Sequence, residues 1–135
     1  MRIGLIDVDS HNFPNLALMR ISAYHKAQGD DVEWWFSDFE HYDIIYKSKT
    51  FSETYTEDTP DPVNCDRLVK GGTGYAIETI NGVEVFDRDA PALPPEMESM
   101  FPDYSIYPQY DYAVAMLTRG CPNNCAFCHV CAKEG

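Results

Sequence analysis

Four cysteines near the end of the chain stand close enough together to bind a metal: Cys121, Cys125, Cys128 and Cys131. The first three follow a C-x3-C-x2-C spacing, and the fourth comes after two further residues. Thiols crowded this closely rarely serve packing, because the chain must turn back on itself to bring the sulfurs together, and a bound metal or cluster makes that turn favourable. We therefore interpret this stretch as a metal-binding loop.

The spacing leaves more than one metal possible. Structural zinc sites usually combine two C-x2-C pairs, or one pair with two histidines, and the only nearby histidine is His129. A 4Fe-4S cluster held by Cys121, Cys125 and Cys128 would have one iron without a thiolate, and that iron is then free to bind a substrate. A zinc or ferredoxin-like binding module and a chance group of buried cysteines remain open alternatives.

The cysteine loop resembles that of the radical S-adenosylmethionine (radical SAM) enzymes, whose C-x3-C-x2-C motif carries an aromatic residue before its last cysteine. Phe127 fills that position. The flanking Thr118-Arg119-Gly120-Cys121-Pro122 resembles the subgroup of this family that has a cobalamin-binding-type domain ahead of the radical domain. The resemblance implies that Cys121, Cys125 and Cys128 bind a 4Fe-4S cluster, and that Phe127 contacts the cofactor S-adenosylmethionine. It also implies a low-potential electron donor such as a flavodoxin or ferredoxin. In the family, the reduced cluster cleaves S-adenosylmethionine to a 5'-deoxyadenosyl radical, which abstracts a hydrogen from substrate.

The beginning of the chain resembles, more loosely, the cobalamin-binding-type domain that precedes the radical domain in one subgroup of this family. Asp9-Ser10-His11 matches the start of the D-x-H-x-x-G motif that supplies a histidine to cobalt, but Pro14 occupies the position of the glycine. We therefore expect no cobalamin, and we expect His11 to be a loop histidine.

Length and composition bound these expectations. A complete α/β barrel takes roughly 250 residues, whereas this chain has 135 and only seven follow Cys128. We expect it to be the front part of a larger enzyme, so substrate and reaction type cannot be read from it.

The hydrophobic content of 44% is that of a folded protein. No apolar run approaches the roughly 20 residues of a membrane span, and no secretory leader is evident, so we expect a cytoplasmic protein without membrane contact.

The charge balance argues against a nucleic acid partner. Ten basic and 22 acidic side chains give a net charge of -12, without a basic stripe. Phosphate backbones would be repelled by such a chain, so we expect no nucleic acid partner.

The first 70 residues read as alternating strands and helices. Strands are predicted at 2–8, 31–36, 43–46 and 66–70, and a helix at 15–28, which Asn15 caps and Gly29 ends. This pattern predicts a Rossmann-like α/β domain with a parallel sheet. Asp9, Ser10 and His11 follow the first strand, where such sheets bind ligands. The polar stretch 47–64 is a loop or a helix that the pattern does not place.

Two turns and a connector complete the prediction. The glycines of 71–74 indicate a turn at a strand end in preference to a phosphate-binding loop, since the P-loop pattern and a downstream helix are missing. Asn81-Gly82 predicts a hairpin between strands at 75–80 and 83–86. Prolines and tyrosines are dense over 87–109 and predict a stiff, extended connector that lies against a surface.

We therefore divide the chain into a Rossmann-like domain (1–87), a connector (88–110) and the start of a radical SAM barrel (111–135). The last part would hold the first barrel strand, 111–117, then the cluster loop and the start of a helix at 133–135. Arg119 would pair with cluster charge or a carboxylate, or lie at the surface. Cys65, far from the others, reads as a buried or half-buried thiol. A ligand-binding Rossmann domain with an inert cysteine tail is a further alternative.

Overall fold

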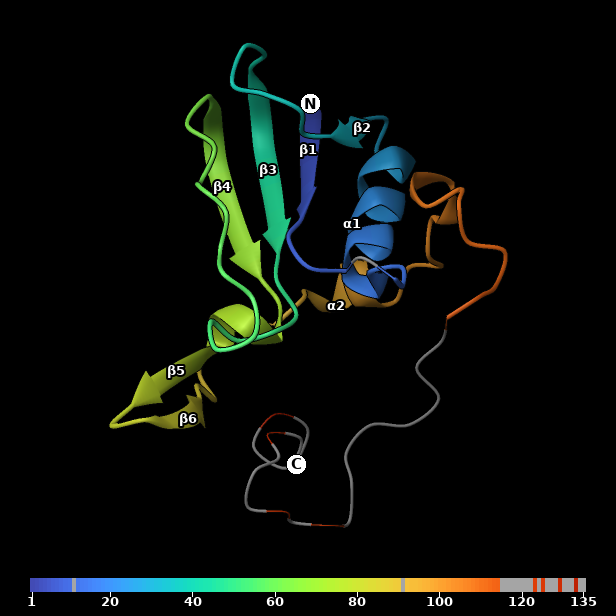
Figure 1. The fold of residues 1–135 in the computed structure, drawn as a ribbon. Helices are drawn as coiled ribbons and strands as arrows, with labels where there is room; N and C mark the ends of the chain where they lie inside the picture. Colours follow the sequence, from blue (N-terminus) through green and yellow to red (C-terminus); the bar gives the residue numbers. More distant parts are fainter. Residues whose placement is uncertain are drawn as a thin grey trace.

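We analysed the chain as a computed structural model, which describes residues 1–10, 12–90 and 92–114, together with Asn123, Cys125, His129 and Lys133. Its centre is a four-stranded parallel sheet with the strand order β2-β1-β3-β4 (Figure 1). The elements in this region are β1 (Arg2–Asp7), α1 (Leu16–Ala27), β2 (Asp31–Trp34), β3 (Tyr42–Ser48) and β4 (Cys65–Gly71). The prediction of an α/β fold built on a parallel sheet is confirmed.

Helix α1 begins and ends at the residues that cap it. The Asn15 side chain accepts a hydrogen bond from the Leu18 main-chain N–H at 3.1 Å, and Gly29 follows the helix with a φ of 83°. Both are the predicted caps. The helix packs against the sheet through Leu18 and Ile21, which join Ile3 and Leu5 of β1 in the hydrophobic core.

Two strand boundaries differ from the prediction, because hydrogen-bonded pairing with the neighbouring strand determines where each strand ends. Strand β3 continues to Ser48, because Lys47 and Ser48 pair with Lys70 and Gly71 of β4. Strand β2 stops at Trp34 instead of Phe36, because its pairing with β1 ends at Leu5. The described residues from 49 to 64 form neither helix nor strand, so this stretch is a loop.

The hairpin follows β4 through a short 3-10 turn, η1 (Thr73–Ala76), and consists of β5 (Ile77–Ile80) and β6 (Val83–Phe86). Asn81 and Gly82 have φ values of 52° and 79°, the two positive angles that a tight hairpin turn of this type requires. The predicted hairpin is confirmed, and it projects from the carboxyl end of β4 (Figure 1).

The stretch predicted as a connector lies against α1. It contains α2 (Pro95–Glu98), whose Met97 enters the core, and a 3-10 turn, η2 (Tyr104–Ile106). The Asp103 carboxylate accepts hydrogen bonds from Ser22 at 2.7 Å and from Lys26 at 2.6 Å. Burial alone would raise the pKa of Asp103, but these hydrogen bonds and those from Ser105 hold it well below its usual range. The expected surface contact is therefore present, although the segment folds back instead of extending.

The described part of the predicted barrel strand forms no strand. Over 111–114 the chain is irregular. Both main-chain groups of Val114 pair with the Tyr104 hydroxyl, at 3.2 Å for the N–H and 3.1 Å for the carbonyl. The Tyr104 side chain thus pairs with the main-chain N–H and carbonyl that Val114 would otherwise offer to a neighbouring strand. Residues 115–117 lie outside the described residues.

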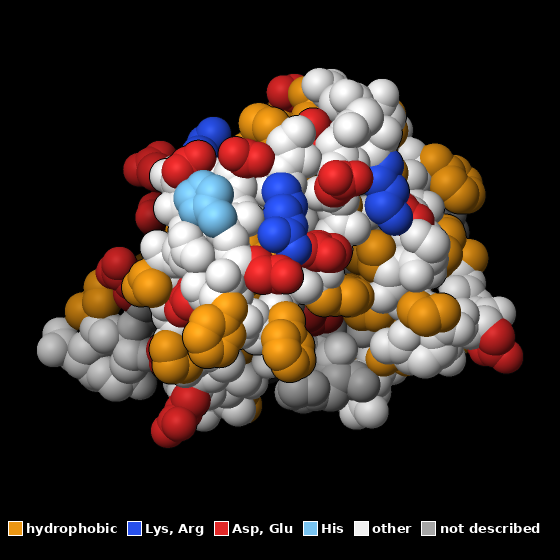
Figure 2. All heavy atoms as spheres, turned by 90° about the horizontal axis from the view of Figure 1, so that it is seen from above, with side chains coloured by type: hydrophobic (Ala, Val, Ile, Leu, Met, Phe, Trp, Pro, Cys, Tyr) orange, Lys and Arg blue, Asp and Glu red, His pale blue; other side chains and the backbone are white. Residues whose placement is uncertain are grey.

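Charge is mixed on the face that carries the amino ends of the strands. Figure 2 shows acidic side chains next to lysine and arginine side chains on this face, with a histidine among them.

Candidate functional site

The carboxyl edge of the parallel sheet is the place where this topology predicts a ligand site. From β1 the chain crosses to β2 on one side, whereas β3 and β4 lie on the other side, so the order changes direction between β1 and β3. Ligands of open α/β sheets bind outside the carboxyl ends of the strands at such a switch point. Three segments meet here: residues 8–10, 49–51 and 72–74.

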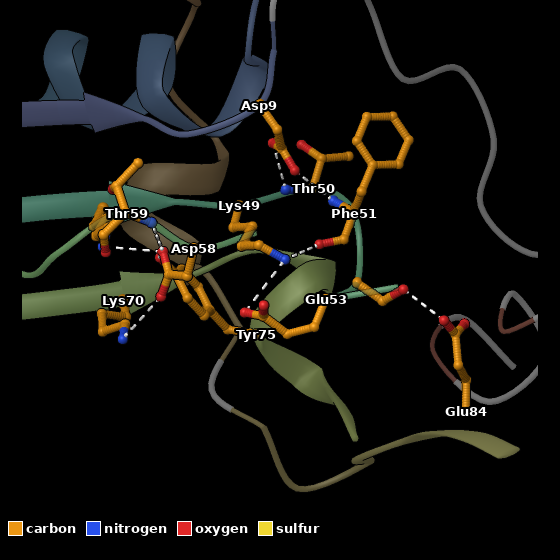
Figure 3. Close-up of polar contacts among 12 residues, drawn as sticks. Asp9, Lys49, Thr50, Phe51, Glu53, Asp58, Thr59, Lys70, Tyr75 and Glu84 are labelled. Carbon is orange, nitrogen blue, oxygen red and sulfur yellow. Dashed lines mark hydrogen bonds and ion pairs between the residues drawn. The ribbon is translucent and has the colours of Figure 1, made fainter. Parts of the chain in front are cut away.

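Asp9 joins two of these segments. Its side chain is buried, and its two carboxylate oxygens accept hydrogen bonds from the main-chain N–H groups of Thr50 and Phe51, each at 2.8 Å (Figure 3). Ser10 is also buried, and its main-chain N–H donates to Asp7 Oδ1 at 3.0 Å. The structure thus places Asp9 and Ser10 at the predicted edge, but Asp9 holds a loop there. His11 lies outside the described residues.

Lys49 packs beneath the glycine-rich turn. Its side chain is fully buried, and Nζ donates to the Phe51 carbonyl at 2.5 Å and lies 3.8 Å from Glu53 Oε1 (Figure 3). The Lys49 carbonyl accepts from the Gly74 N–H at 2.9 Å. A Cβ at Gly72 would lie 2.3 Å from that carbonyl oxygen, and Gly72 has a φ of 102°. The glycines therefore permit a close turn at a strand end, as predicted.

A second buried lysine ties the 49–64 loop to the sheet. Lys47 Nζ lies 3.0 Å from Asp58 and 2.8 Å from Asp61, and its side chain is fully buried. Lys70, its partner across β4, contacts the same two carboxylates at 3.5 and 3.3 Å. Tyr75 donates to Asp58 at 2.8 Å, and its pKa is raised by burial and by this carboxylate.

The space beside this network is small. A hollow of about 190 Å³ lies between the end of β4, the η1 turn and residues 87–90, with Lys70, Tyr75 and Asp87 in its wall. Pockets for cofactor-sized ligands usually measure roughly 300–1,000 Å³. This hollow alone is too small to bind S-adenosylmethionine.

Two described residues of the cysteine segment contact the η1 turn and the β5-β6 hairpin, which follow β4. His129 Nε2 is 3.3 Å from Glu84 Oε2 on β6, and Lys133 Nζ donates to Thr73 Oγ1 at 2.8 Å. The hydrogen bond from Ser52 is the main cause that lowers the pKa of Glu84, and His129 lowers it further. The Lys133 main-chain N–H donates to the His129 carbonyl at 3.0 Å.

Among the predicted metal ligands, Cys125 is described, and its thiol is free and exposed. Cys121, Cys128 and Cys131, together with Phe127 and Arg119, lie outside the described residues. Cys65 is half-buried, as predicted, and burial raises the pKa of its thiol. Sequence reasoning missed the roles of Lys47, Lys49 and Asp9, because each depends on a contact between segments about 40 residues apart or on an irregular loop.

Neither the search for membrane-spanning helices nor the comparisons with known proteins assign a function to this chain. Within the described parts of the chain, no helix has both the length and the apolar character needed to cross a bilayer. No family model matches the chain, and the searches of curated proteins and of solved structures gave no significant match either.

Proposed function

We propose that this chain carries the 4Fe-4S loop of a radical SAM enzyme behind an α/β domain. The observation that carries the proposal is the C-x3-C-x2-C spacing of Cys121, Cys125 and Cys128, with Phe127 before the last cysteine. Three thiolates leave one corner of a cubane cluster free for S-adenosylmethionine. The proposed barrel start, like the cluster itself, rests on this motif.

The two described cysteines lie in different environments. Cys125 is exposed, so its sulfur is accessible to a cluster assembled from solution. Cys65 is partly buried with a raised thiol pKa, which is the environment of an unreactive cysteine. The donor chemistry of the loop therefore fits an iron-sulfur cluster. A cluster held by Cys121, Cys125 and Cys128 would supply one electron for the cleavage of S-adenosylmethionine to methionine and a 5'-deoxyadenosyl radical, which would abstract hydrogen from substrate.

The α/β domain would support the loop in this proposal. Glu84 contacts His129, and Thr73 contacts Lys133, so residues on both sides of Cys131 contact the β5-β6 hairpin and the η1 turn. His129 Nε2 is directed to a carboxylate, which favours leaving it out of the ligand set. A flavodoxin or ferredoxin would supply electrons in the cytoplasm. The acidic net charge of -12 supports a function without nucleic acid.

Cys131 supports one alternative, a non-catalytic module in which four thiolates bind zinc or iron. Anaerobic reconstitution of the full chain with iron and sulfide separates the two proposals. We expect about four irons and four sulfides per chain, with a reduced cluster whose electron paramagnetic resonance (EPR) signal changes when S-adenosylmethionine is added. A signal that does not respond to S-adenosylmethionine would favour the four-thiolate module.

Single cysteine variants identify the ligands. Cys125→Ala should lose the cluster, whereas Cys65→Ala is the matched control and should retain it. Cys131→Ala should retain both the cluster and its response to S-adenosylmethionine. If Cys131→Ala lost the cluster while Cys125→Ala kept it, the three-cysteine assignment would be wrong.

A further inference from the structure

A group of metal-ligating side chains lies at the opposite, amino-terminal edge of the sheet. His41 directly precedes β3, Asp43 is the second residue of β3, and Asp66 is the second residue of β4. One ligand atom from each of the three lies within 4.8 Å of the others. His41 Nε2 is 3.2 Å from Asp66 Oδ1. Figure 2 looks onto this edge of the molecule.

The strand register brings two like charges together here. Asp43 and Asp66 occupy the positions between the Tyr42–Cys65 and Ile44–Arg67 pairs of β3 and β4. Like charges on facing positions of neighbouring strands are destabilising unless a cation compensates them. At the other end of the same strands, Lys47 faces Lys70, and two carboxylates from the 49–64 loop contact both. At the amino end, His41 lies beside the two carboxylates, and the Met1 ammonium also interacts electrostatically with Asp43.

Asn64 fixes the orientation of the His41 ring. The Asn64 side-chain amide donates to the Asp38 carbonyl at 2.9 Å, so its oxygen faces His41 Nδ1, which lies 2.9 Å away. Nδ1 must then carry the hydrogen and donate it. The other nitrogen, Nε2, faces Asp66. Metal-binding histidines are usually held in this way, with one ring nitrogen donating to a neighbouring acceptor and the other bound to the metal.

We propose that His41, Asp43 and Asp66 bind a divalent first-row transition-metal cation at the amino edge of the sheet. One imidazole nitrogen and two carboxylates form a nitrogen and oxygen donor set suited to ions such as Mn²⁺, Fe²⁺ or Zn²⁺. The main-chain N–H of Arg2 donates to Asp43 Oδ2 at 2.6 Å and so orients that carboxylate. His41 and Asp66 are exposed, so water completes the coordination and the ion exchanges freely. This site is independent of the cysteine loop.

Mn²⁺ is the most suitable probe, because thiolates prefer softer metals. The full chain is titrated with Mn²⁺, and free aqueous Mn²⁺ is counted by EPR. We expect one site per chain, retained when Cys121, Cys125 and Cys128 are all replaced by Ser. His41→Ala and Asp66→Asn should each weaken binding by about tenfold or more, and Asn64→Ala should weaken it by about tenfold through the loss of ring orientation.

The control variant is Glu78→Gln, which removes an exposed carboxylate from β5. It changes the net charge as Asp66→Asn does, but it should leave Mn²⁺ affinity unchanged. Circular dichroism checks that each variant is folded, and paramagnetic broadening of the His41 and Asp66 amide signals in wild type locates the ion. Failure of the wild-type chain to bind Mn²⁺, or equal losses in Asp66→Asn and Glu78→Gln, would overturn the proposal.

Discussion

Strands β3 and β4 carry a pair of like charges at each end, and the two pairs differ in how their charge is compensated. Near the carboxyl end, Lys47 faces Lys70, and the loop that follows β3 returns two aspartates, which contact both lysines. Near the amino end, Asp43 and Asp66 lie beside each other with His41 as their neighbour. The chain neutralises one pair by itself, whereas the other pair would be neutralised by an ion.

Burial explains why the two ends differ. The Lys47 side chain has no exposed surface, whereas that of Asp66 is 68% exposed. A buried charge needs partners within the chain, because an isolated charge removed from water costs several kcal/mol. At the amino edge Asp66 is exposed and Asp43 is half-buried, so water still reaches this carboxylate pair and ions can exchange there. The carboxyl edge should therefore depend on its polar contacts for stability, and the amino edge should not.

Gly74→Ala tests the carboxyl edge with the largest expected effect. A Cβ at this position would lie 2.2 Å from the Phe51 carbonyl oxygen, so main chain would have to move. We expect a loss of at least about 3 kcal/mol in the free energy of unfolding, measured by urea denaturation. Gly71→Ala is the matched control, since its Cβ meets nothing within 4 Å, and it should be neutral or slightly stabilising. Equal losses in both variants would contradict the tight approach of the turn to the 49–51 segment.

Lys47→Met should have the second-largest effect. It removes the buried cation, so Lys70 becomes the remaining lysine in contact with Asp58 and Asp61. We expect a loss of about 2–3 kcal/mol, somewhat below the usual cost of breaking a buried pair because both aspartates are partly exposed. Lys70→Met is the control, as its side chain is 35% exposed, and it should cost less than about 1 kcal/mol. Urea denaturation measures both.

The Lys47 contribution should also depend on pH. The hydrogen bond from Lys47 lowers the pKa of Asp61. Burial raises the pKa of Asp58, but hydrogen bonds from Lys47 and Tyr75 outweigh it, so that pKa is lowered as well. A lowered pKa in the folded state stabilises the protein fully above the ordinary value of about 3.9, and this stability is lost as pH falls through the folded-state pKa. The difference between wild type and Lys47→Met should therefore shrink below about pH 4. A difference that stays constant with pH would assign the effect to the hydrogen bond from Lys47 Nζ to the Thr59 carbonyl, which does not titrate.

Asp9→Asn is a milder change at the same edge. An asparagine side chain can accept one of the two main-chain hydrogen bonds, but its NH2 group would face the other N–H donor. We expect a loss of about 1–2 kcal/mol in the free energy of unfolding, because one buried donor loses its partner. Asp9→Ala removes both bonds and should cost more. If Asp9→Asn were neutral, Asp9 would not hold the 49–51 segment.

The same comparison shows what could be predicted from sequence. The βαβ pattern, the Asn15 cap and the Asn81-Gly82 turn are local signals, and the structure confirms them. The two like-charged pairs are not local, because they depend on the register of β3 against β4 and on a loop without periodicity. His41 and Asp66 are 25 residues apart in sequence, and only strand pairing brings them together. The cysteine motif is also a local signal, and the proposal drawn from it rests on its spacing alone.

Asp66→Asn should have the smallest effect on stability, and this is the sharpest contrast with Lys47. The side chain is 68% exposed, and substitution reduces repulsion with Asp43, so we expect a change of less than about 0.5 kcal/mol without added metal. Millimolar Mn²⁺ should then raise the melting temperature of wild type but not of Asp66→Asn, because a ligand stabilises only the state that binds it. A large destabilisation of metal-free Asp66→Asn would mean that the ion pair with His41 supports the fold. The amino edge would then resemble the carboxyl edge, and the contrast between the two ends of β3 and β4 would be lost.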